Sequence, residues 1–210
     1  MNISKRAGIL VIVLIIITIA LVYLIPLLSD TYIYTNPSGE EFKFTKTRVG
    51  NLQMHVLTAY ASYKGDKTNY EYSIPLRYGP KSLEDIHVES GVNNKILNKK
   101  YIYITLDPNL QGNALLASID IAKVLGAADY GVFKLPVQGA FTSPSNTTNS
   151  TGTPIITCKN ANKEVSVIWL AIGNENALYS INECVVVEAT DYDNLIKVAD
   201  RLVYNLLGVM

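Results

Sequence analysis

The feature that most limits how this chain can fold is a long apolar run near its start. Residues 7–28 contain no charged side chain over twenty-two positions. An α-helix of about 20 apolar residues crosses a hydrocarbon layer of about 30 Å, because each residue rises about 1.5 Å. A helix that is apolar on every side would otherwise need a large protein around it. The sequence therefore predicts a transmembrane helix over residues 7–28.

Charged residues beside this run predict its orientation. Lys5 and Arg6 come just before it, and Asp30 is the first acidic residue after it. Basic residues next to a transmembrane helix stay on the cytoplasmic side. We therefore expect a single-pass protein of the cell membrane, with a cytoplasmic tail over residues 1–6 and an extracytoplasmic domain over residues 29–210.

Two other interpretations of the start remain open. A cleaved secretory signal has a shorter apolar stretch of about 7–15 residues and a small-residue cleavage site, which YLIPLLSD does not offer. The motif Lys5-Arg6-Ala7-Gly8 before a long apolar run resembles the processing site of archaeal type IV pilins. That resemblance implies a pilin-like filament subunit as an alternative function.

Composition narrows the classes of partner. Without Lys5 and Arg6, the outer part of the chain holds 16 basic and 18 acidic residues, so it has no basic field for nucleic acid. Charged residues make up only 17% of the chain, while tyrosine alone contributes 14 residues. A surface of neutral polar groups changes little when carboxylates are protonated, which suits an acidic exterior. The alternative is an ordinary surface protein rich in Tyr and Asn, with no adaptation to acid.

The two cysteines, Cys158 and Cys184, both fall in the predicted outer domain. An even number of cysteines in an oxidising compartment indicates a disulfide. Two buried thiols or a redox pair are the alternatives, but a redox pair lacks the Cys-x-x-Cys spacing. We expect a structural disulfide.

The first part of the outer domain, residues 29–91, is rich in β patterns. Residues 31–35 and 41–45 flank a turn at Asn36-Pro37-Ser38-Gly39, which predicts a hairpin. Apolar residues alternate over 52–60 and again over 70–78 around a polar tip, which predicts a second hairpin. Pro75 indicates an edge strand, since proline cannot donate to a ladder.

The second part, residues 92–210, mixes strands with helices. Strands are predicted at 101–106, 130–137, 165–170 and 184–187, and a helix at 113–125 that ends at Gly126. This order predicts an α+β or α/β fold with a mixed sheet.

A C-terminal amphipathic helix is the clearest element. One stripe is apolar, and Thr190 or Asp191 can cap the start while Gly208 ends it. The opposite face is expected to hold the polar residues Asp193, Lys197, Asp200, Arg201 and Asn205. We expect the apolar stripe to pack on the mixed sheet.

The loop over residues 142–153 carries two glycosylation sequons. Asn146 and Asn149 each begin an Asn-x-Ser/Thr motif in a stretch rich in Ser, Thr and Pro. Because the predicted topology places this loop outside the cell, we expect a glycan on at least one of them.

Candidate site residues gather where a strand gives way to a helix. Asp107, Asn109 and Asn113 follow the strand at 101–106 and precede the helix at 113–125, the position where α/β sheets commonly bind ligands. The same residue types are ordinary turn and cap residues, so both interpretations stand. The segment 174–176 is either a polar turn or a ligand-contacting loop.

No pattern for a metal, a cofactor or catalysis stands out. His87 lies among Glu84 and Glu89 without a regular spacing, and His55 lies in a predicted strand. The Walker A, G-x-G-x-x-G, G-x-S-x-G and H-E-x-x-H motifs are absent from the sequence. We expect neither a metal nor a cofactor.

Loosely, the whole chain resembles cell-surface proteins of thermophilic archaea in its composition. The residues that carry this resemblance are the apolar run, residues 142–153 and strands rich in Ile and Tyr such as 101–106. It implies a cell-envelope setting. The leading hypothesis is a membrane-anchored domain that binds or scaffolds other envelope or membrane proteins, and a membrane-anchored hydrolase acting around Asp107 and Asn109 is the alternative.

Overall fold

The computed structural model describes residues 30–110, 112–126, 131–144 and 152–210. Residues 33–210 group into one unit by their internal contacts, and residues 1–32 into another. The apolar run at 7–28 and the sequon residues Asn146 and Asn149 lie outside the described ranges. No helix within those ranges has the length and apolar character needed to cross a bilayer.

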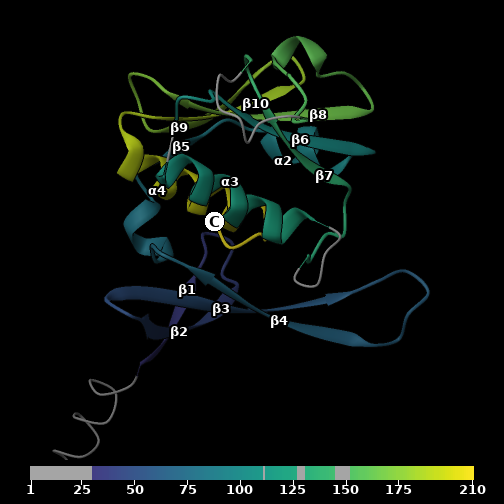
Figure 1. The fold of residues 1–210 in the computed structure, drawn as a ribbon. Helices are drawn as coiled ribbons and strands as arrows, with labels where there is room; N and C mark the ends of the chain where they lie inside the picture. Colours follow the sequence, from purple (N-terminus) through teal and green to yellow (C-terminus); the bar gives the residue numbers. More distant parts are fainter. Residues whose placement is uncertain (1–29, 111, 127–130, 145–151) are drawn as a thin grey trace, which may run out of the picture. The chain divides into compact units, whose positions relative to one another are not determined.

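The fold is α+β, with two sheets and a helical layer (Figure 1). One sheet is antiparallel and has four strands in the order β1-β2-β3-β4. Its strands are β1 (Thr31–Thr35), β2 (Glu41–Val49), β3 (Leu52–Ser62) and β4 (Asn69–Leu76).

The second sheet is mixed and has six strands in the order β5-β9-β10-β8-β6-β7. Its strands are β5 (His87–Val88), β6 (Tyr101–Leu106), β7 (Val137–Phe141), β8 (Val165–Ile172), β9 (Ala177–Ile181) and β10 (Cys184–Ala189). The helices are α2 (Val92–Leu97), α3 (Asn113–Leu125) and α4 (Tyr192–Leu206), with short 3-10 turns η1 (Pro80–Leu83) and η3 (Cys158–Asn160). Helices α3 and α4 pack side by side, and α4 also contacts β10 and β8.

Both predicted hairpins of the first sheet are confirmed, and Pro75 lies in the edge strand β4 as expected. In β3, however, the predicted apolar set at 52–60 is not the face that is buried. Leu57, paired with Phe44 on β2 and Ile74 on β4, is fully buried, whereas Leu52 and Tyr60 are 55% and 61% exposed. The inner face of β3 is therefore the one with fewer large residues.

The C-terminal helix is confirmed as α4, and Asp191 caps its start by accepting a hydrogen bond of 2.8 Å from the Asn194 amide. The prediction is wrong for one residue of the polar face, Asp200. Asp200 is fully buried, because the segment that follows β4 covers this side of the helix. The helical period of α4 predicts which side is apolar, but it does not predict that the segment after β4 will cover the polar side.

The strand predicted at 130–137 is wrong over its described part. Residues 131–136 are not a strand, and β7 begins at Val137. The amides of Val132 and Phe133 instead donate to the Val124 carbonyl at the end of α3, and that of Leu135 donates to Leu125. The parallel register between Val137 and Ile102 then sets where β7 starts.

Helix α2, strands β5 and β9, and the turns η1 and η3 were not predicted from the sequence. Helix α2 has only six residues, and β5 has two, both too short for a periodic pattern. Strand β9 pairs antiparallel with β10 and supplies the hairpin that makes the sheet mixed. The expected strands at 101–106, 165–170 and 184–187 and the helix at 113–125 are confirmed.

The disulfide between Cys158 and Cys184 is confirmed, with an S–S distance of 2.02 Å. It ties the segment from Pro154 to Glu164 to β10. The same segment accepts a hydrogen bond of 2.7 Å at the Ile156 carbonyl from Thr105 on β6.

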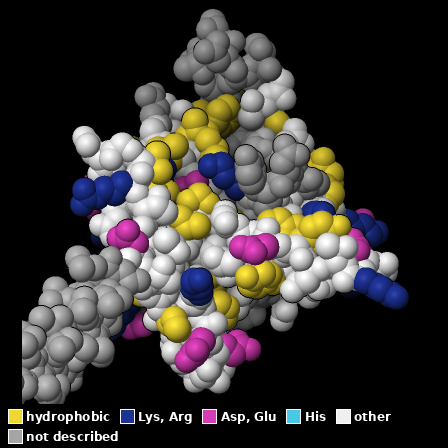
Figure 2. Space-filling view, turned by 90° about the horizontal axis from the view of Figure 1, so that it is seen from below, with side chains coloured by type: hydrophobic (Ala, Val, Ile, Leu, Met, Phe, Trp, Pro, Cys, Tyr) yellow, Lys and Arg dark blue, Asp and Glu magenta, His cyan; other side chains and the backbone are white. Residues whose placement is uncertain are grey.

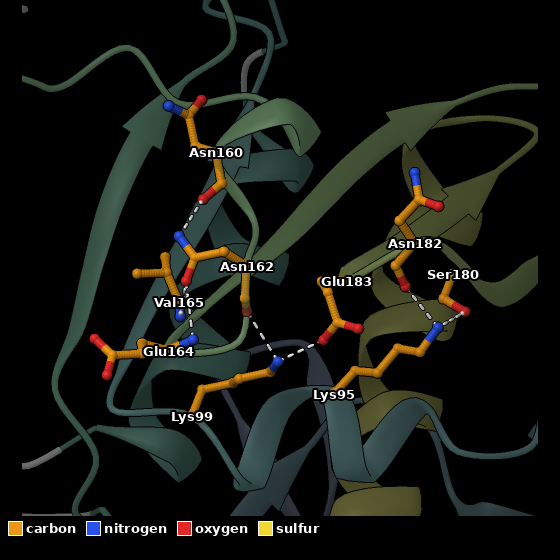
Figure 3. A network of polar contacts seen from close by, with 9 residues as sticks. All are labelled: Lys95, Lys99, Asn160, Asn162, Glu164, Val165, Ser180, Asn182 and Glu183. Carbon is orange, nitrogen blue, oxygen red and sulfur yellow. Dashed lines mark hydrogen bonds and ion pairs between the residues drawn. The ribbon is translucent and has the colours of Figure 1, made fainter.

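Lys95 of α2 and Lys99, two residues after the end of that helix, bind the same region (Figure 3). The Lys99 ammonium, on a residue only 9% exposed, donates to the Asn162 carbonyl and to Glu183 beside Cys184. This bond and the charge of Lys99 hold the pKa of Glu183 below its ordinary value. Lys95 donates to Ser180 and to the Asn182 carbonyl in the turn between β9 and β10. The disulfide, the ion pair of Lys99 and the hydrogen bonds of both lysines therefore hold together the two ends of the loop between Cys158 and Cys184.

We predict that the disulfide contributes about 3–4 kcal/mol to the free energy of unfolding, because it closes a loop over a sequence separation of 26 residues. Denaturant unfolding of the full chain in detergent, with and without a reductant, measures this contribution. The reductant should lower the stability of the native chain and leave a Cys158→Ser/Cys184→Ala variant unchanged. Equal unfolding curves for the oxidised and reduced native chain would contradict the prediction.

Candidate functional site

An apolar groove lies between the four-stranded sheet and the end of α4, and its volume is about 730 Å³. A volume of this size falls in the range of sites that bind small molecules or a few side chains of a partner. Its lining residues come from β2, from β3 and its tip, from the segment after α3 and from the end of α4. They are Glu41, Phe42, Lys43, Leu57, Thr58, Ala59, Tyr60, Ala61, Ser62, Tyr63, Val132, Phe133, Leu206 and Leu207.

Small side chains on β3 leave room for the groove. Ala59 and Ala61 follow Leu57 on the inner face of the strand, where they pair with Tyr72 and Tyr70 of β4. A methyl side chain at each position leaves space that a larger residue would fill. The alternation Leu-x-Ala-x-Ala is the sequence signal of the groove, and it is visible only when β3's buried face is known.

Hydrogen bonds of Tyr63 fix one wall of the groove. Its hydroxyl lies 2.6 Å from the Tyr72 hydroxyl and donates to the Val132 carbonyl over 2.8 Å. Burial, together with the neighbouring Tyr72, raises the pKa of Tyr63 to about 12, so the phenol stays protonated and can donate. The Lys134 ammonium lies 4.1 Å from the centre of the Tyr63 ring and adds a cation–π contact. The tip of the second hairpin is thereby joined to the segment after α3.

A buried carboxyl group joins the four-stranded sheet to α4, whose end lines the groove through Leu206 and Leu207. Oδ2 of Asp200 on α4 accepts hydrogen bonds of 2.9 Å from the backbone amides of both Arg77 and Tyr78, just after β4. Tyr204, one turn along α4, donates to the Tyr78 carbonyl over 2.8 Å. Its ring also meets Phe44 of β2 edge to face at 5.7 Å between centroids. These contacts, which we call the Asp200 clamp, hold the four-stranded sheet against α4.

The Asp200 carboxyl titrates far from the ordinary range of an aspartate. Burial raises the pKa of Asp200 from 3.8 to about 7, against the lowering effect of the Tyr78 amide, and nearby Asp120 raises it further. Asp120 lies 3.3 Å from Arg77, whose charge lowers the pKa of Asp120 although burial raises it. The second oxygen of Asp200, Oδ1, is buried without a hydrogen-bond partner in the described part of the chain. Burial and Asp120 favour the protonated form, whereas the two donated amides and the charge of Arg77 favour the ionised form.

The predicted site residues Asp107 and Asn109 lie together, but in a turn of their own. Oδ1 of Asp107 accepts hydrogen bonds of 2.8 Å from the amide and from the side chain of Asn109. This is an Asx turn that follows β6, in which one oxygen of Asp107 accepts from both the backbone and the side chain of Asn109.

Asn113, the third predicted residue, contacts a different helix. It begins α3, and its side chain donates to Asp193 in the first turn of α4 over 2.7 Å. This hydrogen bond joins the starts of two helices, and within the described residues Asn113 makes no hydrogen bond to Asp107 or Asn109.

The segment 174–176 is a polar turn between β8 and β9. Glu188 of β10 accepts hydrogen bonds from the Asn174 amide at 2.7 Å and from the Tyr179 hydroxyl. A Cβ on Gly173 would lie 2.0 Å from Oε1 of Glu188, so a side chain at this position would displace the Glu188 carboxylate. These hydrogen bonds hold the turn against β10.

The described residues contain no group of three or more His, Cys, Asp or Glu placed to hold a metal ion. Glu89 from the acidic segment near His87 instead accepts from the amide and hydroxyl of Ser180 on β9. His55 is half-buried on β3, and burial lowers its pKa.

The lining of the groove is mainly apolar. Its floor and walls are aliphatic and aromatic, while the charged residues Glu41 and Lys43 are exposed on β2. Such a lining binds apolar groups and excludes water from them. Comparison of the chain with known protein families, with curated proteins and with solved structures finds no match.

We predict that the stability contributed by Asp200 falls as the pH rises. Its folded pKa of about 7 lies above its unfolded value, so the folded state binds the extra proton between about pH 4 and pH 7. The contribution is complete below the unfolded pKa and is lost as the pH rises through the folded one. Asp200→Asn, which cannot ionise, should flatten this slope when unfolding of the full chain in detergent is measured across the range.

A matched control lies on the same helix. Bonds to the Asn194 amide lower the pKa of Asp191, so this exposed cap titrates below the range of interest. Asp191→Asn should leave the slope between about pH 4 and pH 7 as it is in the native chain. Parallel curves for Asp200→Asn and the native chain would show that Asp200 does not titrate there.

Proposed function

We propose that this protein is a membrane-anchored extracytoplasmic binding module that holds an apolar segment of another envelope or membrane protein in its groove. The observation that carries the proposal is the groove itself, about 730 Å³ lined mostly by apolar side chains. Tyr63 and the Asp200 clamp fix its walls, and a preformed site loses less entropy on binding.

The location in the proposal rests on the sequence and on the disulfide. Residues 7–28 have the length and composition of a membrane-spanning helix, and Lys5 and Arg6 favour an outer position for the rest. A disulfide such as that between Cys158 and Cys184 persists in oxidising compartments. Both observations support the proposed extracytoplasmic location.

A protein segment fits the groove better than a charged substrate does. The lining offers aromatic and aliphatic surface from Phe42, Phe133, Leu206 and Leu207, the kind of pocket that receives the apolar anchor residues of a partner. Glu41 and Lys43 lie exposed beside it, where they can pair with charges on a partner's flanking residues.

We predict that filling the groove removes partner binding. In Ala61→Phe, the new ring occupies the space over β3, and contact with a partner should fall by about tenfold or more, as for the loss of one buried anchor. The measurement is photo-crosslinking of the full chain in its native membranes, with the reactive group placed at Phe133 on the groove wall.

Ser73→Phe is the matched control, because Ser73 is exposed on the outer face of the adjacent strand β4. It adds the same ring to the same sheet and should leave the crosslinked partner in place. The proposal fails if Phe133 captures no membrane or envelope protein, or if Ala61→Phe captures the same partner as Ser73→Phe.

A further inference from the structure

The turn between β2 and β3 reaches past the start of β1. The Asn36 amide donates to the Glu40 carbonyl over 2.9 Å and closes the first hairpin. Counting back from this pair places Thr31 opposite Thr45, so the last four residues of β2, ending at Val49, extend beyond the start of β1. At about 3.4 Å per residue, this extension is about 13 Å long.

The chain between the apolar run and β1 is short. Only residues 29 and 30 separate Leu28 from Thr31, and three Cα steps span at most about 11 Å. If residues 7–28 span the membrane as proposed, β1 starts close to its surface. The extension of β2 is as long as this linker, so the turn after it can reach back to the surface.

Exposed apolar side chains occupy the tip of that turn. Val49 and Leu52 pair across it and are 64% and 55% exposed. Gly50, with φ of 62°, forms the two-residue connection together with Asn51. Figure 2, turned by 90° from Figure 1, shows hydrophobic side chains in separate patches, with basic and acidic groups between them.

The charge of this hairpin differs from that of the domain around it. Between Glu41 and Asp66 the sequence has no acidic residue, but it contains Lys43, Lys46 and Arg48. Lys46 and Arg48 are exposed on the strand that leads to the tip. Basic residues beside exposed apolar ones are the pattern of a segment that sits in the headgroup layer of an anionic membrane.

We propose that the tip of the β2–β3 hairpin dips into the headgroup layer of the bilayer, with Val49 and Leu52 inserted and Lys46 and Arg48 beside lipid phosphates. This inference rests on the membrane anchor of the proposed function, not on the groove. It gives the domain a second contact with the membrane and so fixes the direction in which the groove is presented.

Quenching of a fluorescent label tests the contact in the full chain. Leu52→Cys, labelled on its single free thiol, is reconstituted in vesicles of phosphatidylcholine with and without phosphatidylglycerol. A nitroxide on the lipid headgroup should quench this label strongly, and aqueous iodide should quench it several-fold less than a label at Ile181→Cys. Ile181 is 43% exposed at the end of β9 and serves as the matched control.

The charge is tested in the same labelled chain. Lys46→Glu/Arg48→Glu should reduce headgroup quenching at position 52, and this loss should be larger in vesicles that contain phosphatidylglycerol, because the acidic replacements repel its phosphate. Quenching that is unaffected by the replacement in both kinds of vesicle would overturn the role of the two basic residues.

Each remaining outcome decides between the claims. A chain that leaves the vesicles in an alkaline wash has no transmembrane anchor, which overturns both this inference and the proposed membrane location. A chain that stays, with iodide quenching equal at positions 52 and 181, overturns the inference alone. Protection from iodide without headgroup quenching means that protein, for example a second copy, covers the tip, and this also overturns it.

Discussion

The arrangement of this domain depends on one buried carboxyl group in its last helix. Asp200 accepts two backbone amides from the segment after β4, and it does so where water cannot replace them. Removing the acceptor would leave two buried donors unpaired, at about 1–3 kcal/mol each. Phe44 and Tyr204 pack beside this point, so polar and apolar contacts hold the four-stranded sheet on α4 together. Without that contact the groove would lose one of its sides.

The same carboxyl group makes the stability of the fold depend on pH. Because burial raises the pKa of Asp200 to about 7, protonation of this carboxyl favours the folded state, even though the two amides bind the ionised form more strongly. Bonds that lower the pKa values of surface carboxylates such as Glu188 and Asp191 act in the opposite direction, but only in stronger acid. A mildly acidic exterior, which the low content of charged residues suits, would therefore favour the folded state.

Much of the fold could be predicted from local patterns, and the rest consists of elements too short for a pattern or set by contacts that no pattern shows. The two hairpins, three strands of the second sheet, helix α3, helix α4 and the pairing of Cys158 with Cys184 follow from alternation, periodicity and an even cysteine count. Asp200 was misplaced because a helical period shows which side is apolar and not what will cover the other side. The strand predicted at 130–137 failed because α3's last carbonyls compete for the amides of residues 132, 133 and 135.

The candidate site was harder to predict than the fold. Asp107, Asn109 and Asn113 have the residue types of a ligand site, but their bonds are those of a turn and of a contact between helices. The groove instead depends on Ala59 and Ala61, whose significance appears only when Leu57 identifies the inner face of β3. Small residues carry no chemical signature of their own. A search for sequence motifs therefore does not find a groove that forms where side chains are small.

The central claim is that the Asp200 clamp makes the two sheets one cooperative body with a preformed groove. Amide hydrogen exchange at Arg77 and Tyr78 in the full chain tests it most directly. The account predicts that these two amides exchange only on global unfolding, with the same free energy as the core strands β8 and β10, and that Asp200→Ala shifts them alone to a faster, local opening. Rapid exchange of both amides in the native chain, while β8 and β10 stay protected, would contradict it.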